Sequence, residues 1–441
     1  MAVAHGGVRR RVSRRLYSLL IYCAVPWATA VVLWRALSDR GYRQGLGERF
    51  GWGRRNPTPT LWLHAVSLGE VAAAAPLVRA LRARYPDEPL VMTTATPTGR
   101  ARAVSLFGAA VEVRFLPYDM PGAVARFLDR VRPRLAVIME TELWPNLFAG
   151  CGRRGVPVVL ASARLSAKSV RRYRRLRSLS RGVFSAVSLI AAQTGEDAER
   201  FIAIGADGAR TRVAGNIKFD LELPAGVVEA GRELRKFHGE ARPTWIAGST
   251  HAGEEEQLLA AHAELPDDAL LLLVPRHPDR FDDVAHLLAA RGVTFIRRSG
   301  GRAPDGATRV VLIDSVGELA ALYAAADAAF VGGSLVPIGG HNLLEPAALG
   351  LPVLTGPSHA NSREIARLLL DQGAALEVKD ARELAAALRR LLADPAERQR
   401  MGAIGRRIVE SNRGSVQRLL GLIESLRSDP AAAAAHPSAR R

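Results

Sequence analysis

A carboxylate and an amide, three residues apart, follow a glycine-rich segment in the last third of the chain. Residues 328–331 are apolar and lead into Gly332-Gly333, Gly339-Gly340, Asn342 and Glu345. This order predicts a strand, a loop and a helix start, with the amide and carboxylate on one face of the first turn. Glycines let backbone N–H groups approach a ligand, and a helix start favours negative charge. Glu345 would repel phosphate but suits ribose hydroxyls, so the segment is predicted to cradle a nucleotide. The alternative is a tight strand-to-helix connection without a ligand.

A second carboxylate stands at another predicted helix start. A strand predicted over residues 61–64 leads into a loop that ends at Glu70, where an alanine-rich helical segment begins. A helix start stabilises negative charge, and open α/β sheets bind ligands beyond the carboxyl ends of their strands. Glu70 is therefore a candidate catalytic carboxylate. The alternative is that Glu70 only caps the helix and His64 only packs.

These residues require a scaffold, and the chain after residue 57 alternates short apolar strands with helical stretches, which predicts an α/β fold. Predicted strands cover residues 61–64, 90–94, 111–116, 135–140, 156–161 and 189–193, and then 245–247, 270–275, 294–297, 310–313, 328–331, 352–354 and 375–378. The segment 215–242 lacks a clear strand, which predicts two Rossmann-like domains facing across a cleft. The predicted divisions are a basic flank and membrane anchor (1–43), two domains (44–222 and 223–427) and a flexible tail (428–441).

Composition favours an anionic partner and a reducing compartment. The 441 residues include 61 Lys and Arg against 43 Asp and Glu, a formal net charge of +18. Nucleic acid, an acidic membrane surface and a phosphorylated lipid all fit that charge. The two cysteines, Cys23 and Cys151, form neither a disulfide framework nor a metal-ligand spacing, which indicates the cytoplasm.

The amino-terminal region predicts a membrane anchor. No charged residue occurs from Leu16 to Trp34, and arginines flank the run on both sides. Spanning a bilayer needs about 20 mostly apolar residues. A cleavable signal peptide is disfavoured because its small-residue site, Ala28-Thr29-Ala30, lies inside the apolar run. A buried core helix remains an alternative, and the flanking charges leave orientation and insertion depth open.

The motifs together resemble the 3-deoxy-D-manno-octulosonic acid (Kdo) transferases, bacterial enzymes that add Kdo to a lipid A precursor. Besides the glycine loop, the matching segments are Trp62-Leu63-His64-Ala65-Val66-Ser67-Leu68-Gly69-Glu70, Glu140-Thr141-Glu142-Leu143-Trp144-Pro145-Asn146, Ala163-Arg164-Leu165-Ser166, Gly215-Asn216-Ile217-Lys218-Phe219-Asp220, Ala247-Gly248-Ser249-Thr250-His251 and Pro275-Arg276-His277-Pro278. The resemblance covers about residues 16–427. It implies the GT-B architecture, CMP-Kdo as donor, the lipid A precursor lipid IVA as acceptor, and the cytoplasmic side of the inner membrane.

Kdo transfer from CMP-Kdo needs a base for the acceptor hydroxyl and cations for the leaving phosphate. Glu70 is predicted as the base, and Lys218 and Arg276 as the cations. The resemblance also gives Glu70 the proton-acceptor role and implies that Glu140 and Lys218 stabilise the transition state. It implies that CMP contacts Pro275, Arg276, Val316, Gly317, Glu318, Asn342, Leu343, Leu344 and Glu345.

We expect an inverting reaction that needs neither a cofactor nor a metal. The sequence contains no Asp-x-Asp triplet and no His/Cys cluster with ligand spacing. Cations and helix dipoles can meet the charge of a nucleoside monophosphate. His64, His251, His277 and His341 are predicted to be hydrogen-bonding loop residues.

An acid-free basic run gives a tentative acceptor or membrane contact. It comprises Arg164, Lys168, Arg171, Arg172, Arg174, Arg175, Arg177 and Arg181. Like charges at this spacing repel, and anionic lipids or lipid A phosphates would relieve the repulsion. A solvated basic face is the alternative, whereas nucleic acid is disfavoured because Tyr173 is the only interleaved aromatic residue. Two rival functions remain, another GT-B-type sugar-nucleotide enzyme or a non-catalytic membrane-attached nucleotide-binding protein.

Overall fold

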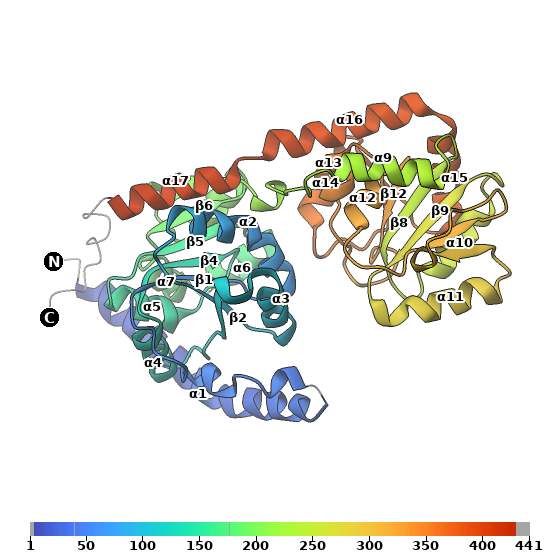
Figure 1. Cartoon of the computed structure of the whole chain (residues 1–441). Coiled ribbons are helices and arrows are strands. Elements are labelled where there is room, and N and C mark those ends of the chain that lie inside the picture. Colours follow the sequence, from blue (N-terminus) through green and yellow to red (C-terminus); the bar gives the residue numbers. More distant parts are fainter. Residues whose placement is uncertain (1–3, 39, 176, 429–441) are drawn as a thin grey trace. The chain divides into compact units, whose positions relative to one another are not determined.

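The chain folds into two compact α/β units, each of which is described by itself (Figure 1). The structure is a computed structural model that describes residues 4–38, 40–175 and 177–428, so the tail predicted at 428–441 lies outside the described residues apart from Ser428. One unit comprises the described residues up to Asp220 together with those from Arg413 on, and the other comprises Leu221–Asn412.

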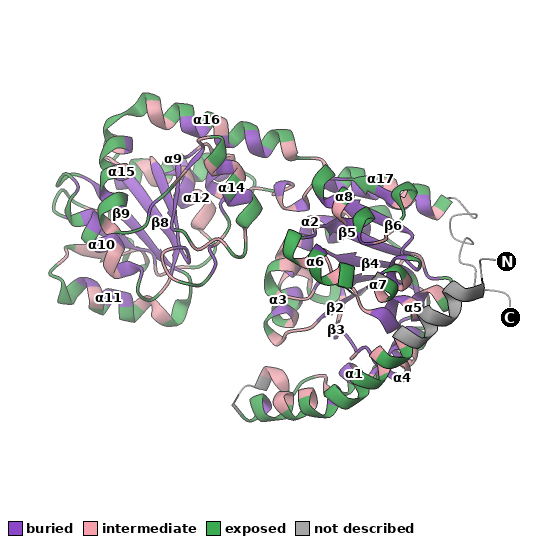
Figure 2. Cartoon of the chain, turned by 180° about the vertical axis from the view of Figure 1, so that it is seen from behind, coloured by how far each residue is buried: buried purple, intermediate pink, exposed green. Residues whose placement is uncertain are grey.

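The first unit contains a seven-stranded parallel sheet in the order β3-β2-β1-β4-β5-β6-β7. Its strands are β1 (Thr60–His64), β2 (Leu90–Thr94), β3 (Glu112–Phe115), β4 (Pro133–Met139), β5 (Val158–Ala163), β6 (Leu189–Ala192) and β7 (Thr211–Val213). The central strands are mostly apolar on both faces because helices cover both sides of a parallel sheet. Figure 2 shows the central strands of this sheet as buried. The edge strand β7 exposes two of its three residues.

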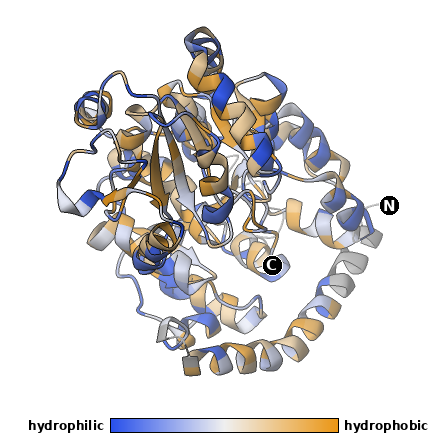
Figure 3. Ribbon diagram, turned by 90° about the vertical axis from the view of Figure 1, so that its right-hand side faces the viewer, coloured by the Kyte–Doolittle hydropathy of each residue, from blue (hydrophilic) through white to orange (hydrophobic). Residues whose placement is uncertain are grey.

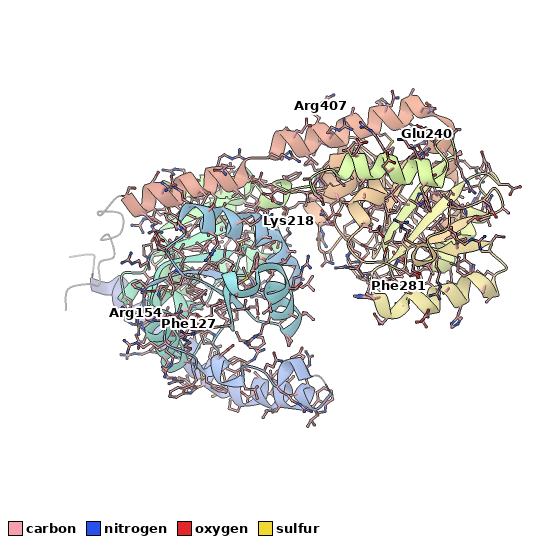
Figure 4. All side chains as sticks on the ribbon, viewed as in Figure 1. Phe127, Arg154, Lys218, Glu240, Phe281 and Arg407 are labelled. Atoms are coloured by element: carbon pink, nitrogen blue, oxygen red, sulfur yellow. The ribbon has the colours of Figure 1, made fainter. Side chains whose placement is uncertain are left out.

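Helices cover the two faces of this sheet separately. One core cluster joins α2 (Leu68–Arg84), α3 (Pro97–Phe107) and α17 (Ser415–Ser428) to one set of alternating strand side chains. The other joins α4 (Pro121–Val131), α5 (Pro145–Arg153), α6 (Ala167–Arg175), α7 (Arg177–Phe184) and α8 (Gly195–Ala203) to the opposite set. In this second cluster Trp62 packs edge to face against Phe127, which is labelled in Figure 4, with ring centroids 5.0 Å apart.

The second unit repeats the architecture, with strand order β10-β11-β9-β8-β12-β13-β14. Its strands are β8 (Thr244–Thr250), β9 (Leu270–Pro275), β10 (Phe295–Arg297), β11 (Val310–Leu312), β12 (Ala328–Val331), β13 (Val353–Thr355) and β14 (Ala375–Glu377). The surrounding helices are α9 (Val227–His238), α10 (Glu255–Ala263), α11 (Phe281–Ala290), α12 (Leu319–Ala324), α13 (Leu344–Leu349), α14 (Arg363–Asp371), α15 (Ala381–Ala393) and α16 (Pro395–Asn412). Figure 3 shows hydrophobic residues concentrated along the strands.

The division of the chain differs from the predicted one at its carboxyl end. The sequence assigned residues 223–427 to the second domain, whereas the chain from Arg413 on belongs to the first unit. The Asp220 carboxylate accepts hydrogen bonds from the backbone N–H groups of Gly414 and Val416, at the start of α17. Leu419 and Ile423 of this helix are fully buried in the core of the first unit. Burial of the apolar face of α17 therefore holds this helix on the first unit, although the sequence pattern assigned it to the second domain.

The amino-terminal helix α1 (Ala4–Ser38) contains a stretch, Arg14–Leu37, that is long and apolar enough to cross a membrane. Ser18 Oγ donates to Asn146 Oδ1 at 3.0 Å, and Val25 packs against Met120 and Ala123 of the first unit. Most of the other apolar side chains are exposed, including Trp27 and Leu37 at 74% each. The alternative of a buried core helix is therefore excluded.

Candidate active site

Glu70 lies in the first turn of α2, directly after the carboxyl end of β1. The Ser67 hydroxyl caps this helix and accepts the Glu70 N–H at 3.4 Å, while the Glu70 carboxylate accepts the Val66 N–H at 2.9 Å. Glu70 thus shapes the loop, as the capping alternative expected. One carboxylate oxygen makes this backbone bond, which fixes the orientation of the carboxyl group.

The environment of Glu70 favours its protonated form. Its pKa is raised to about 7, chiefly by burial and also by the negative charges of Glu140 and Glu142. The Val66 N–H and the Lys218 ammonium act in the opposite direction. A carboxyl group with a pKa near neutrality can both accept and release a proton under cellular conditions.

Glu140 lies just beyond the carboxyl end of β4 and binds two cations. Arg164 Nε donates to one carboxylate oxygen at 2.8 Å, and Lys218 Nζ donates to the other at 3.2 Å. The Glu140 backbone has a φ of 51°, in the left-handed region that non-glycine residues rarely adopt. Such strain persists where the surrounding structure enforces it, which is common at functional sites.

Lys218 is positioned by the short 3-10 helix Ile217–Phe219, which follows β7 (Lys218 is labelled in Figure 4). The Asn216 side chain caps this turn by accepting the Lys218 N–H at 3.0 Å. The Lys218 ammonium is directed to Glu140, and its charge is felt at Glu70. The first unit therefore brings together the three predicted catalytic residues, Glu70, Glu140 and Lys218.

The basic run is divided between two places. Arg164, predicted as an acceptor contact, is instead bound to Glu140, because it follows β5 and this strand is adjacent to β4 in the sheet. Arg171, Arg172, Arg174 and Arg175 lie on α6 and are exposed. The sequence missed the role of Arg164 because it was counted as one more arginine in the run.

A pocket of about 360 Å³ lies at the loop that follows β4 in the first unit. Its lining includes Tyr17 of α1, Glu142 and Trp144 of the loop after β4, and Arg172 and Tyr173 of α6. Burial raises the pKa of Glu142, with a further contribution from Glu140. The pocket therefore combines aromatic surfaces, one cation and one carboxyl group.

His64 contributes to packing rather than to this cluster. Its ring is completely buried at the end of β1, where Nδ1 lies 3.0 Å from the Thr93 carbonyl oxygen and 2.9 Å from its hydroxyl. Burial lowers the pKa of His64 to about 4, so the ring is neutral. The alternative considered for this residue, a packing role, is the one observed.

In the second unit, Asn342 and Glu345 interact as their spacing predicted. The Asn342 amide donates to the Glu345 carboxylate at 3.0 Å, and its carbonyl oxygen caps α13 by accepting the Leu344 N–H at 3.1 Å. Burial raises the pKa of Glu345, while Asn342 and the Arg276 charge oppose the shift. Leu343 and Leu344 are each 1% exposed, so both residues pack in the interior beside this pair.

The other predicted nucleotide contacts lie on two further loops. Pro275 ends β9, and the exposed Arg276 follows, with its backbone N–H held by the Thr250 carbonyl at 3.0 Å. Val316 is 77% exposed in the loop after β11. Gly317 has a φ of 98°, and the next residue, Glu318, bonds to Ser315 and Arg298. The structure brings Arg276 near Glu345 but gives no such link to residues 316–318.

The glycine loop does not hold its N–H groups ready for a ligand, and that expectation was wrong. Gly333 donates to the Glu254 carboxylate at 2.7 Å, and Gly332, Gly339 and Gly340 donate to Gly248, Ser358 and Gly333. A side chain at Gly332 would collide with the Ser249 carbonyl. These glycines therefore allow close packing of the loops, and their N–H groups are satisfied within the protein.

Glu254 and Glu255 organise the second unit's loops, and sequence reasoning missed both. Glu254 is 0% exposed and accepts N–H groups from His251, Gly333, Ser334 and Leu335 at 2.7–3.0 Å. Glu255, also 0% exposed, binds Arg280 at 2.7 Å and the Thr250 hydroxyl at 3.0 Å. Adjacent acidic residues at a helix start, right after a strand-end motif, were the available signal.

Comparison with known proteins defines first a class and then a family. A family model described as "Glycosyl transferases group 1" matches residues 306–408. A second, described as "3-Deoxy-D-manno-octulosonic-acid transferase (kdotransferase)", matches residues 44–221. The fold is shared with UDP-GlcNAc 2-epimerase from Neisseria meningitidis, which aligns with a TM-score of 0.55 over 83% of this chain and 100% of that one, at 12% identity.

Two relatives then identify the family. A 3-deoxy-D-manno-octulosonic acid transferase from Haemophilus influenzae is 42% identical over 93% of this chain and 98% of its own length. One from Bordetella pertussis is 40% identical over 94% of this chain and 99% of its own length. The chain belongs to the 3-deoxy-D-manno-octulosonic acid transferase family. The resemblance found from the motifs is confirmed, and so is its glycosyltransferase class.

Proposed function

We propose that the protein transfers Kdo from CMP-Kdo to a lipid A precursor, by an inverting and metal-independent reaction with Glu70 as the general base. Family membership supports the donor and the transferred sugar. The observation that carries the mechanism is the Glu70 carboxyl group, which has a pKa of about 7 and lies near the Glu140–Lys218 pair. A non-catalytic nucleotide-binding protein would have no use for such a tuned carboxyl group.

The proposed step is a single displacement at the anomeric carbon of Kdo. The acceptor hydroxyl forms the new C–O bond while Glu70 takes its proton. The bond between that carbon and the phosphate oxygen breaks, and its electron pair leaves with CMP. Attack opposite the leaving group inverts the anomeric configuration, because no covalent enzyme intermediate intervenes.

The Glu140 cluster supports the charge changes in this step. Positive charge develops on the sugar ring in an oxocarbenium-like transition state, and a carboxylate nearby stabilises it. Arg164 and Lys218 each donate a hydrogen bond to Glu140 and so fix its two carboxylate oxygens. Lys218 therefore has two proposed tasks, holding Glu140 and offering positive charge to the departing phosphate.

In the second unit, Arg276 and Glu345 support donor binding. The Arg276 guanidinium suits the phosphate of CMP, and the Glu345 carboxylate suits ribose hydroxyls. We assign the same nucleotide to the backbone of residues 316–318 and 342–344 and to Pro275. Cations at the phosphate make a metal ion unnecessary in this scheme.

The pocket that Glu142 lines is the proposed binding site for the acceptor's sugar and phosphate head group. Tyr17, Trp144 and Tyr173 offer flat apolar surfaces to a sugar ring, and Arg172 offers positive charge to a phosphate. The neighbouring Arg171, Arg174 and Arg175 are assigned to anionic lipid head groups. Each such contact is worth about 1 kcal/mol near an acidic membrane surface.

We propose that α1 anchors the enzyme on the cytoplasmic side of the inner membrane. Ser18 and Val25 pack against the first unit, while Trp27, Leu33 and Trp34 are exposed. One side packed on protein and apolar side chains exposed on the others support attachment of this helix to a membrane. The cytoplasm is also where a nucleotide-activated sugar is supplied.

One incubation tests the proposal as a whole. Full-length protein in detergent would receive CMP-Kdo and a tetraacylated lipid A precursor, with products analysed by mass spectrometry and linkage configuration by NMR. We expect Kdo added with inverted configuration and unchanged rates in EDTA. Retained configuration would reject the single displacement, and activity lost in EDTA but restored by magnesium would reject metal independence.

A further inference from the structure

Three histidines from three different strand ends meet in the second unit. His251 follows β8, His277 follows β9, and His341 follows the loop after β12. The Nε2 atoms of His251 and His341 are 2.7 Å apart, with ring planes only 10° from parallel. His277 stands edge-on to His251 with centroids 5.4 Å apart. These strands are neighbours in the sheet, so the rings lie where open α/β sheets bind ligands.

The contact between two Nε2 atoms restricts the protons that the pair can hold. One Nε2 must donate an N–H and the other must accept it, so the pair can be neutral or carry one positive charge. A doubly protonated pair would place two N–H groups against each other and could not keep the contact. The pair therefore behaves as one titrating unit that can gain a single proton.

The charges around the pair keep it neutral in the free protein. Arg276, His277 and Arg280 face it from the β9 loop, and burial together with these groups lowers the pKa of His251 and lowers that of His341 to about 4. The nearby carboxylates are already engaged. Glu254 and Glu255 accept the hydrogen bonds described above, and Glu345 binds Asn342.

We propose that the His251–His341 pair is part of the donor's anion-binding site and takes up one proton when the nucleotide binds. This rests on the proposed function, which puts the CMP phosphate beside Arg276. An anion near an imidazole raises its pKa, reversing the effect of the neighbouring cations. The protonated pair then offers an N–H and a positive charge to the phosphate.

The pair has a consequence for the reaction as well. The phosphate of CMP-Kdo carries one negative charge, and cleavage leaves CMP with a second. The positive charge that the histidine pair acquires on binding stabilises this second negative charge on the phosphate. The proton enters from solvent with the donor and returns to solvent when CMP leaves, so the overall reaction is balanced without it.

Calorimetric titration of the full-length protein with CMP at pH 7.5 tests the inference. At this pH the free nucleotide has lost its second phosphate proton, and the free pair is neutral. Titrations in buffers with different ionisation enthalpies report the protons taken up. We expect the uptake of about one proton per CMP bound. The affinity for CMP should fall by up to tenfold for each unit by which the pH is raised. An uptake near zero in the unmodified protein overturns the proposal without any variant.

Variants then locate the proton. His251→Gln and His341→Gln should each abolish the uptake and flatten the pH dependence, whereas His286→Gln, on the exposed surface of α11, should change neither. Uptake that survives both variants but disappears in His277→Gln overturns the assignment to the pair. Failure of the unmodified protein to bind CMP would overturn the proposed donor site, and the inference with it.

Discussion

The two units use charged side chains at their strand ends in opposite ways. In the first unit, Glu140 is bound between two cations, and its negative charge helps to raise the pKa of Glu70. In the second, Glu254 is satisfied by four backbone N–H groups and holds the loops together, while Arg276 is exposed. In the proposed mechanism, the same sheet architecture supports a proton acceptor in one unit and an anion-binding surface in the other. Side-chain pairing, rather than fold, makes the difference.

The largest effect should follow from removing the proton acceptor of the first unit. Glu70→Gln keeps the shape of the side chain but cannot accept the acceptor's proton, so kcat should fall by about 10²-fold or more. The affinity for CMP should not change, because its predicted contacts lie in the second unit. Steady-state kinetics and CMP titration measure the two quantities, and near-normal turnover would remove Glu70 from its role.

The pH profile of the unmodified enzyme is the companion measurement. The base works when deprotonated, so kcat/KM for the acceptor, measured at saturating CMP-Kdo, should rise with pH through the value of about 7 to which the Glu70 pKa is raised. Glu140→Gln removes one of the charges that raise it and should move the midpoint to lower pH. A midpoint unaffected by this change would mean that the two carboxyl groups are not coupled.

Glu345→Ala should weaken the nucleotide site of the second unit. Hydrogen bonds to a charged group contribute about 1.5–3 kcal/mol, which corresponds to roughly a 10- to 100-fold loss of CMP affinity. The pH midpoint assigned to Glu70 should stay in place. If transfer collapsed while CMP affinity was preserved, the assignment of separate tasks to the two units would be wrong.

Glu254→Gln should loosen the second unit without touching the first. An amide in place of the carboxylate turns one N–H acceptor into a donor, at a cost of about 1–3 kcal/mol in the free energy of unfolding. The midpoint temperature of thermal unfolding should fall by about 2–4 °C for each kcal/mol lost. The KM for the donor should increase by a larger factor than kcat decreases. Glu264→Gln, in an exposed ion pair with Arg389, is the matched control and should change neither.

The smallest effect concerns the acceptor contacts of α6. Arg172 lines the pocket, whereas Arg175 lies on the same exposed helix outside its lining. Arg172→Gln should raise the acceptor KM about fivefold, the equivalent of about 1 kcal/mol, and Arg175→Gln should raise it less. Equal effects on detergent-solubilised acceptor would favour a general basic surface over a specific pocket contact.

Much of the fold was predictable because parallel strands are continuous apolar runs. Leu270–Pro275 is wholly buried, and its sequence leaves little alternative. β7 was not predicted, because Thr211–Val213 has only three residues and exposes two of them. The position of α17 depends on its packing against a sheet whose strands lie far earlier in the sequence. No local sequence pattern encodes such a long-range contact.

The sequence predicted which residues belong to the candidate site better than it predicted which of them bind to each other. Asn342 and Glu345 interact across one helical turn, so their spacing was sufficient. The bond between Glu140 and Arg164 depends on β4 and β5 being neighbours in the sheet. The glycine loop misled because a buried carboxylate, Glu254, satisfies the N–H groups that were predicted to meet a ligand.

The last helix, α17, sets an order of events during synthesis. Its buried face completes the core of the first unit, yet it is translated after every residue of the second. Domains usually fold from the amino terminus as the chain emerges. Here the second unit, to which we assign the nucleotide, has its full sequence available first, and the unit that carries Glu70 cannot close until α17 has been translated. Because α1 precedes both sheets in the chain, the anchor that we propose is available to the membrane before the unit that carries Glu70 is complete.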